Sequence, residues 1–124
     1  MSLQIGHLGE DKASSYLIEN NYKILERNVF LHWGEIDIIA EKNNTLFFVE
    51  VKSCFDYSKV SPIDNMSKNK IRHLLRSIQL YLVKNKISNR KYKLSLIAII
   101  FSNDKTVSSL KFYDSLDICN AGYF

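Results

Sequence analysis

Apolar residues recur at helical spacing in two stretches of the chain. Between residues 67 and 85 they occupy positions i, i+3, i+4 and i+7, and Ser67 stands where a helix N-cap is expected. Residues 6–21 carry a weaker version of the same pattern, which ends at Asn20 and Asn21. We therefore predict an amphipathic helix in each stretch.

Other stretches are short, apolar and rich in β-branched or aromatic residues, as strands are. They span residues 22–31, 36–41, 46–51, 94–101 and 107–113. In the first of them, residues 29–31 are the expected buried part. Residues 94–101 form an almost continuous apolar run, which is typical of a central strand covered on both faces. We interpret residues 89–92 as a basic linker and residues 114–124 as a short helix or tail.

The predicted order of elements is α-β-β-β-α-β-β, which indicates an α/β fold with one mixed sheet flanked by helices. The connection through residues 67–85 is long enough to make the third and fourth strands parallel, with a right-handed crossover. The 124 residues are enough for one domain with a real hydrophobic core, so we expect residues 1–124 to form a single domain.

Residues 34–52 carry the clearest chemical signal. If Asn43-Asn44 is the centre of the turn, the numbers of facing residues sum to 87, so Asp37 faces Glu50. Lys52 lies two residues beyond Glu50 and projects from the same face. Directly opposed like charges destabilise a sheet, and a divalent cation would remove the conflict. The alternative is that these are solvated charges on an exposed face, but the flanking residues are strongly apolar.

Glu10 is a further candidate. It lies three residues before Ala13 and seven before Leu17, so it shares the apolar face of the first predicted helix. A carboxylate on an inward face is unfavourable unless it is paired or bound to a metal. The alternative is a first-turn acid that the helix dipole favours. For Trp33, which could stack on a base, packing in the core or at the sheet edge is the preferred interpretation.

Basic residues are concentrated in one part of the chain. Residues 59–93 contain ten Lys or Arg residues and a single acid, Asp64, whereas the net charge of the whole chain is only +4. Such a concentration suits a polyanionic partner, although a solubilising helix surface has the same composition. Cys54 and Cys119 lack metal-type spacing and suggest a reducing compartment. With no signal-peptide core and no membrane-length apolar run, we expect a cytoplasmic protein.

The residues of the hairpin also carry a resemblance. Asp37 followed by Glu50-Val51-Lys52 on the next strand resembles the pattern of the restriction-endonuclease-like PD-(D/E)XK nucleases. A closer resemblance, to the YraN-like family of small bacterial proteins, runs through nearly the whole chain. It rests on Gly9-Glu10, Ala13, Tyr16-Leu17, Asn28, residues 34–40, residues 48–52 and Lys68. That family is similar in fold to archaeal Holliday-junction resolvases.

The resemblance implies a restriction-endonuclease-like core and a Mg²⁺- or Mn²⁺-dependent endonuclease acting on DNA, with branched DNA as one candidate. Asp37, Glu50 and the Val51 carbonyl would hold the metal, and Glu10 would bind one of its waters or a second ion. Lys52 would orient or deprotonate the attacking water, or stabilise the transition state. Resolvase-like relatives also suggest a homodimer, because symmetric junction cutting needs two sites.

Positively charged residues of the second predicted helix would bind backbone phosphates: Lys68, Arg72 and Arg76. The chain departs from the family where an arginine usually follows the lysine, because Ser53 and Cys54 stand there. It also has Lys93 and Ser95 in place of an Arg-x-Asp. These changes favour a second hypothesis, a nucleic-acid-binding module without catalysis. A third is a protein-interaction adaptor whose hairpin carboxylates are structural.

Overall fold

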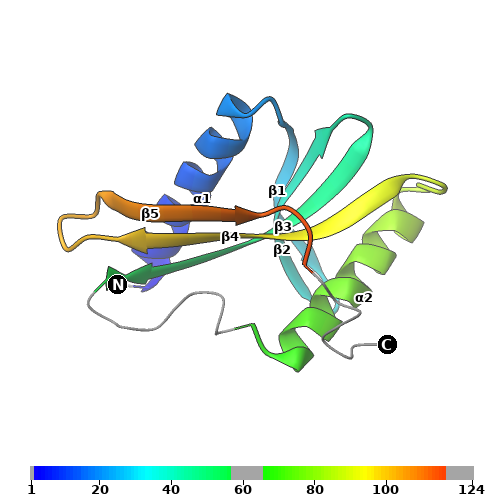
Figure 1. The fold of residues 1–124 in the computed structure, drawn as a ribbon. Coiled ribbons are helices and arrows are strands. Elements are labelled where there is room, and N and C mark those ends of the chain that lie inside the picture. Colours follow the sequence, from blue (N-terminus) through cyan, green and yellow to red (C-terminus); the bar gives the residue numbers. More distant parts are fainter. Residues whose placement is uncertain (1, 57–65, 117–124) are drawn as a thin grey trace.

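A computed structural model describes residues 2–56 and 66–116 (Figure 1). The elements follow the predicted order α-β-β-β-α-β-β, so the α/β fold class is confirmed. Their bounds are α1 (Ser2–Glu19), β1 (Lys23–Leu31), β2 (Gly34–Lys42), β3 (Thr45–Phe55), α2 (Lys68–Lys84), β4 (Lys91–Phe101) and β5 (Val107–Tyr113).

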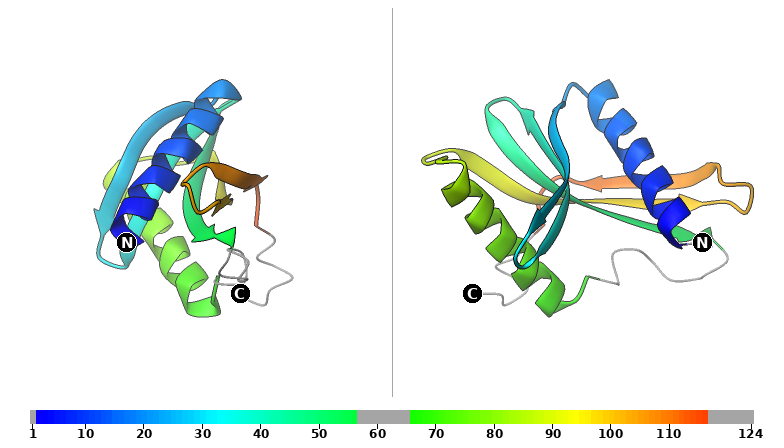
Figure 2. Two further views of the ribbon diagram at one scale, coloured as in Figure 1. Left: turned by 90° about the vertical axis from the view of Figure 1, so that its left-hand side faces the viewer. Right: turned by 180° about the vertical axis from the view of Figure 1, so that it is seen from behind.

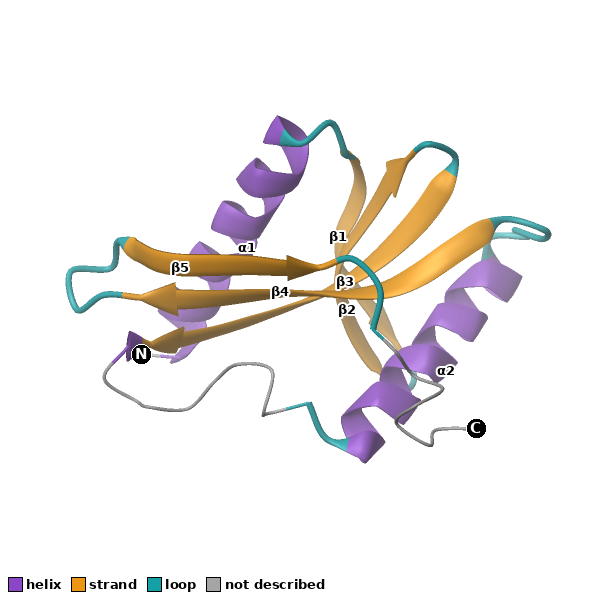
Figure 3. Cartoon of the chain, in the orientation of Figure 1, coloured by secondary structure: helices purple, strands orange, loops and turns teal. Residues whose placement is uncertain are grey.

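The strands form one five-stranded sheet in the order β1-β2-β3-β4-β5. Neighbouring strands are antiparallel except β3 and β4, which are parallel as predicted because α2 carries the chain back between them. The sheet is strongly twisted, and α1 and α2 lie on different sides of it (Figures 2 and 3).

The core has two parts, one under each helix. Strand residues alternate between them, because successive side chains of a strand point to opposite faces. The part under α2 includes Ile39, Leu46, Phe48, Ile71, Leu74, Ile78 and Leu94. The part under α1 includes Ala13, Leu17, Ile38, Ala40, Phe47, Val49, Ile97 and Ile99. Ser67 caps α2 as predicted, since its side-chain oxygen accepts a hydrogen bond from the amide of Lys70.

The predicted register of the β2–β3 hairpin is confirmed. Paired residues run from Lys42 with Thr45 to Ile38 with Val49, and each pair sums to 87. Asn43 and Asn44 both have positive φ, 51° and 62°, as the two central residues of a type I′ turn require. Asparagine tolerates this conformation better than most residues, so the turn sequence sets the register.

Some local predictions were wrong. Phe30 is 75% exposed rather than buried, because the inward-facing positions of β1 at this end are its neighbours Val29 and Leu31. The predicted basic linker is partly strand, since β4 begins at Lys91. Residues 114–116 are not helical, and the rest of the predicted terminal element lies outside the described residues, as do Lys59 and Cys119. Among the described residues no helix is both long and apolar enough to cross a membrane.

Candidate functional site

The site lies where strands β2 and β3 separate. Their pairing ends at Ile38 and Val49; beyond this point β3 stays paired with β4, and β2 stays paired with β1. Asp37 lies at the point of separation, where its Oδ2 accepts a hydrogen bond from the backbone amide of Val51 at 2.8 Å. A side chain thus takes the place of a backbone partner, and the sheet opens around a carboxylate.

Asp37 and Glu50 are both buried at this point, with only 8% and 4% of their surface exposed. Burial, followed by the hydrogen bond and the charge of Glu50, raises the pKa of Asp37 to about 9, and the amide of Val51 opposes this only in part. The close approach of two carboxylates that the register predicts is therefore present. At neutral pH it places a shared proton, or a cation, between them.

Two more carboxylates converge on Asp37. Glu10 reaches it from α1 and Glu35 from β2, and the three residues can offer oxygens that all lie within 4.8 Å of one another. Burial, then the negative charges of Glu10 and Glu50, raises the pKa of Glu35. Sequence reasoning assigned no role to Glu35. Its spacing was a usable signal, because residues two apart on a strand share a face.

Two cations partly balance this negative charge. The Nζ atom of Lys70 lies 3.1 Å from Glu50 Oε2, and an Nη2 atom of Arg27 lies 3.8 Å from Glu10 Oε1. Arg27 is closer to Asp11, at 2.9 Å. Neither Glu10 Oε1 nor Glu50 Oε2 accepts a well-aligned hydrogen bond from the described residues, so both are ion-paired without a directed donor. Sequence reasoning noted Lys70 only as one of many basic residues.

The other predicted site residues are placed as follows. Lys52 is half-buried on β3, two residues beyond Glu50, and pairs with Ala98 of β4. Val51 contributes its amide to Asp37, while the metal-binding role of its carbonyl stays a prediction. Lys68 and Arg72 are exposed on α2, as their proposed phosphate contacts require. Arg76 is also exposed but lies against the ring of Trp33.

Close packing of α1 against β3 brings Glu10 to the site. A Cβ atom placed on Gly9 would lie 2.1 Å from Ser53 Oγ, closer than any real contact. An alanine at this position, directly before Glu10 in the sequence, would force the Ser53 side chain to shift. Gly6 has open space where its Cβ would be, so the close approach of α1 is specific to Gly9.

The oxygen atoms that this site offers as ligands suit a hard divalent cation. Mg²⁺ and Mn²⁺ prefer carboxylate oxygens, and the cluster offers oxygens from Glu10, Glu35 and Asp37. Two further observations agree with such an ion: the raised pKa of Asp37 and the carboxylate oxygens of Glu10 and Glu50 without hydrogen-bond donors. A divalent cation would account for both observations, because it favours the ionised form of Asp37 and gives these oxygens a directed partner.

Fold and site together define a small α/β protein with an acidic centre at the open end of a hairpin. The chain belongs to the family described as "Uncharacterised protein family UPF0102", whose pattern matches residues 9–99. It is similar to a UPF0102 protein of Persephonella marina, at 40% identity over 79% of this chain and 84% of the relative. A UPF0102 protein of Sulfurimonas denitrificans is 44% identical over 68% of this chain and 76% of the relative.

Proposed function

We propose that the protein is a Mg²⁺- or Mn²⁺-dependent endonuclease that acts on DNA phosphodiester bonds, with branched DNA as a candidate substrate. The observation that carries this proposal is the convergence of the buried Asp37 with the half-buried Glu10 and Glu35, beside the buried Glu50, where β2 and β3 separate. A cluster of carboxylates that cations balance only in part is unfavourable for folding. A function that needs concentrated negative charge explains why the fold tolerates it.

The residues of the site divide the work between them. Asp37, Glu35 and Glu10 would hold the cation, with Glu50 beside them and the Val51 carbonyl as the further ligand that the family resemblance implies. When bound, a divalent cation activates water and neutralises the charge of a phosphate. Lys52 would orient the attacking water or stabilise the charge that develops on the phosphate. Lys70 would change partner from Glu50 to a substrate phosphate once a cation neutralises Glu50.

The charge of α2 supports DNA as the substrate class. Lys68 and Arg72 are exposed on this helix, and Lys70 in the same first turns already reaches the carboxylate site. Lysine and arginine contacts to phosphates position a nucleic acid without reading its sequence. Binding should therefore be tolerant of sequence and should weaken as salt rises. A homodimer would supply two sites for symmetric cutting, and sedimentation at micromolar concentration would reveal it.

The second candidate is a DNA-binding module of the same fold that does not cleave. The contacts of Lys70 with Glu50 and of Arg27 with Glu10 favour it, because these cations neutralise the carboxylates without a metal. Ser95, which stands where the family has the aspartate of its Arg-x-Asp, favours it as well: it is fully buried and its hydroxyl donates to the carbonyl of Asp114, so this position offers no carboxylate to the site.

The deciding experiment is cleavage of a labelled four-way junction, with duplex and single-stranded controls, in Mg²⁺, Mn²⁺ or EDTA. The protein and its Lys52→Ala variant are compared, with Lys111→Ala, an exposed lysine of β5, as the matched control. Metal-dependent cutting by the protein and by Lys111→Ala, lost in Lys52→Ala, is the expected result. Binding without cutting in every metal would establish the second candidate. Neither binding nor cutting would leave the adaptor interpretation.

A further inference from the structure

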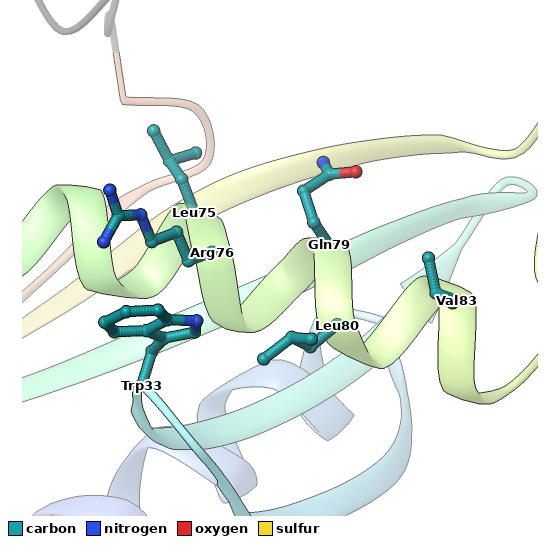
Figure 4. Close-up of a pocket in the computed structure, with 6 residues that line it drawn as sticks. All are labelled: Trp33, Leu75, Arg76, Gln79, Leu80 and Val83. Carbon is teal, nitrogen blue, oxygen red and sulfur yellow. The ribbon is translucent and has the colours of Figure 1, made fainter.

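The outer surface of α2 carries an apolar hollow that the phosphodiester site does not use. Its volume is about 470 Å³, within the usual range of ligand sites. Apolar side chains form most of its wall, and Leu80 and Val83 remain 38% and 76% exposed. Figure 4 shows the lining residues, which are Trp33, Leu75, Arg76, Gln79, Leu80 and Val83. An exposed apolar surface of this kind marks a binding site more often than chance.

One end of the hollow is formed by Trp33, which follows strand β1 in the turn before β2 (Figure 4). Its indole stacks on the ring of His73, with centroids 5.9 Å apart and planes at 27°. The guanidinium of Arg76 lies 4.6 Å from the centroid of the same indole. Although α2 holds the ring in place, 38% of Trp33 stays exposed. The ring is therefore both fixed and accessible.

Trp33 also lies beside the carboxylate site. A second, smaller hollow also has Trp33 in its wall, and its other lining residues include Glu35 and Lys70. Glu35 belongs to the carboxylate cluster, and Lys70 pairs with Glu50. A strand whose phosphate lies at the cluster can thus place a neighbouring nucleotide beside Trp33.

The charge around the hollow selects the kind of occupant. Helix α2 contains five Lys or Arg residues and no Asp or Glu in its sequence KNKIRHLLRSIQLYLVK. The one charged residue among those that line the hollow, Arg76, is also positive. An apolar surface beside such a helix suits a ligand that has flat apolar faces and negative charge. A nucleotide has both. Stacking of bases on aromatic side chains beside a basic groove is the usual mode of single-strand binding.

We propose that Trp33 and the hollow along α2 hold an unpaired nucleobase of a DNA strand whose phosphate lies at the carboxylate site. The inference rests on the proposed function and narrows its substrate to DNA with unpaired nucleotides, as in single strands, flaps and open junctions. Bases of a continuous duplex are already stacked on each other, so they do not reach the hollow.

The test uses the fluorescence of Trp33, the single tryptophan of the chain, in EDTA so that no cleavage takes place. The whole protein is titrated with a short single-stranded oligonucleotide and with one of equal length made only of abasic sites. Both carry the same phosphates, but one lacks bases. We expect the first to quench the tryptophan emission and the second to bind without quenching it.

Affinity measurements with labelled oligonucleotides supply the second arm. Trp33→Ala and Leu80→Ala should weaken binding of the oligonucleotide with bases, by about tenfold for Trp33→Ala, and leave binding of the abasic one unchanged. Leu25→Ala is the matched control, because Leu25 on β1 is as exposed as Leu80, at 38%, and is not part of the hollow's lining. Circular dichroism checks that each variant folds.

The outcomes separate this inference from the proposed function. One outcome would overturn the inference and leave the proposed nuclease function standing. In it the protein cleaves DNA when a metal is present, the oligonucleotide with bases quenches no more than the abasic one, and Trp33→Ala binds the oligonucleotide with bases as tightly as the wild type does. Base-dependent quenching without cleavage in any metal would keep the base site and overturn the nuclease. Should Trp33→Ala fail to fold, the comparison of the two oligonucleotides on the wild-type protein still decides.

Discussion

The two ends of the β2–β3 hairpin differ in nearly every physical property. At the turn end, residues 38–42 and 45–49 are fully paired, and their side chains fill both parts of the core. At the open end the pairing stops, and the buried side chains include the carboxylates of Asp37 and Glu50. One end supplies apolar burial and backbone hydrogen bonds, whereas the other concentrates negative charge in a poorly solvated place.

The difference teaches how this small chain separates stability from function. Burial of apolar side chains at the turn end offsets the electrostatic cost at the open end. The two ends are covalently part of the same hairpin, so they fold together. Substitutions at the turn end should therefore reduce the free energy of unfolding. Substitutions of the carboxylates should reduce function while leaving the fold unharmed or more stable.

The largest expected effect lies at the turn end. Phe48 is 1% exposed and makes edge-to-face contacts with Tyr81 and Tyr92. Phe48→Ala should lower the free energy of unfolding by about 3–5 kcal/mol, because it leaves a cavity between β3 and α2. Urea denaturation measures this. Val83→Ala, at a position 76% exposed, is the control and should change it by less than about 0.5 kcal/mol. Equal effects of the two would contradict the assignment of the core.

The second prediction has the opposite sign. Asp37→Asn removes a buried acid from beside Glu50, while the amide oxygen can still accept the hydrogen bond from Val51. We expect the free energy of unfolding at pH 7 to rise by about 1–4 kcal/mol and metal-dependent cleavage to be lost. Denaturation and the junction assay are run on the same preparation. If the variant is destabilised and still cleaves, Asp37 is a structural residue of the open end and not a functional one.

The same carboxyl predicts a pH dependence with a definite sign. Because the pKa of Asp37 is raised in the folded state, its proton binds more tightly there than in the unfolded chain. Its stabilising contribution is complete below about pH 4 and is lost as the pH rises toward about 9. Denaturation of the metal-free protein between these values should show this decline, and the Asp37→Asn variant should show a flatter profile.

A smaller effect is expected where α1 approaches β3. Gly9→Ala should lower the free energy of unfolding by about 1–2 kcal/mol, because the new methyl group would meet Ser53 Oγ. Gly6→Ala is the matched control on the same helix: it should raise stability by up to about 1 kcal/mol, since alanine favours helix and finds open space. Adding Ser53→Gly to Gly9→Ala should restore most of the loss. Thermal unfolding reports all three, and identical effects of the two glycines would remove the packing argument.

The smallest effect concerns the helix beside the open end. Arg72→Ala should reduce the slope of log affinity against log salt for DNA by about 1, because it removes one phosphate contact. Lys84, at the far end of the same helix, is the control, and Lys84→Ala should change the slope less. Fluorescence anisotropy over a series of salt concentrations measures both. If the two variants have the same slope, DNA does not follow the first turns of α2.

The turn end could be predicted almost completely from the sequence. The two asparagines of the turn set the register, and both strands are apolar on either side of it. The opposition of Asp37 and Glu50 followed from that register. Glu10 was found because its carboxylate lies on an apolar helix face, a conflict that a sequence shows directly.

The cations of the open end could not be predicted in the same way. Lys70 is one of several basic residues on α2, and which of them reaches Glu50 depends on how the helix crosses the sheet. Arg27 reaches Glu10 and Asp11 across two elements that are distant in sequence. Glu35 could have been recognised by its spacing from Asp37. The exposure of Trp33 depends on the packing of its turn against α2, a tertiary contact.

The central claim is that the open end of the hairpin holds a divalent cation. Its most direct test is a calorimetric titration of Mn²⁺ into the protein and into the Asp37→Asn variant, at pH 6, 7.5 and 9. Glu19→Gln, an exposed acid at the end of α1, is the control. The account predicts one Mn²⁺ site whose affinity rises with pH, because the ion displaces a proton from Asp37. The Asp37→Asn variant should lose this site, and the Glu19→Gln variant should keep it. No binding by the wild-type protein, or equal binding by Asp37→Asn, would contradict the claim.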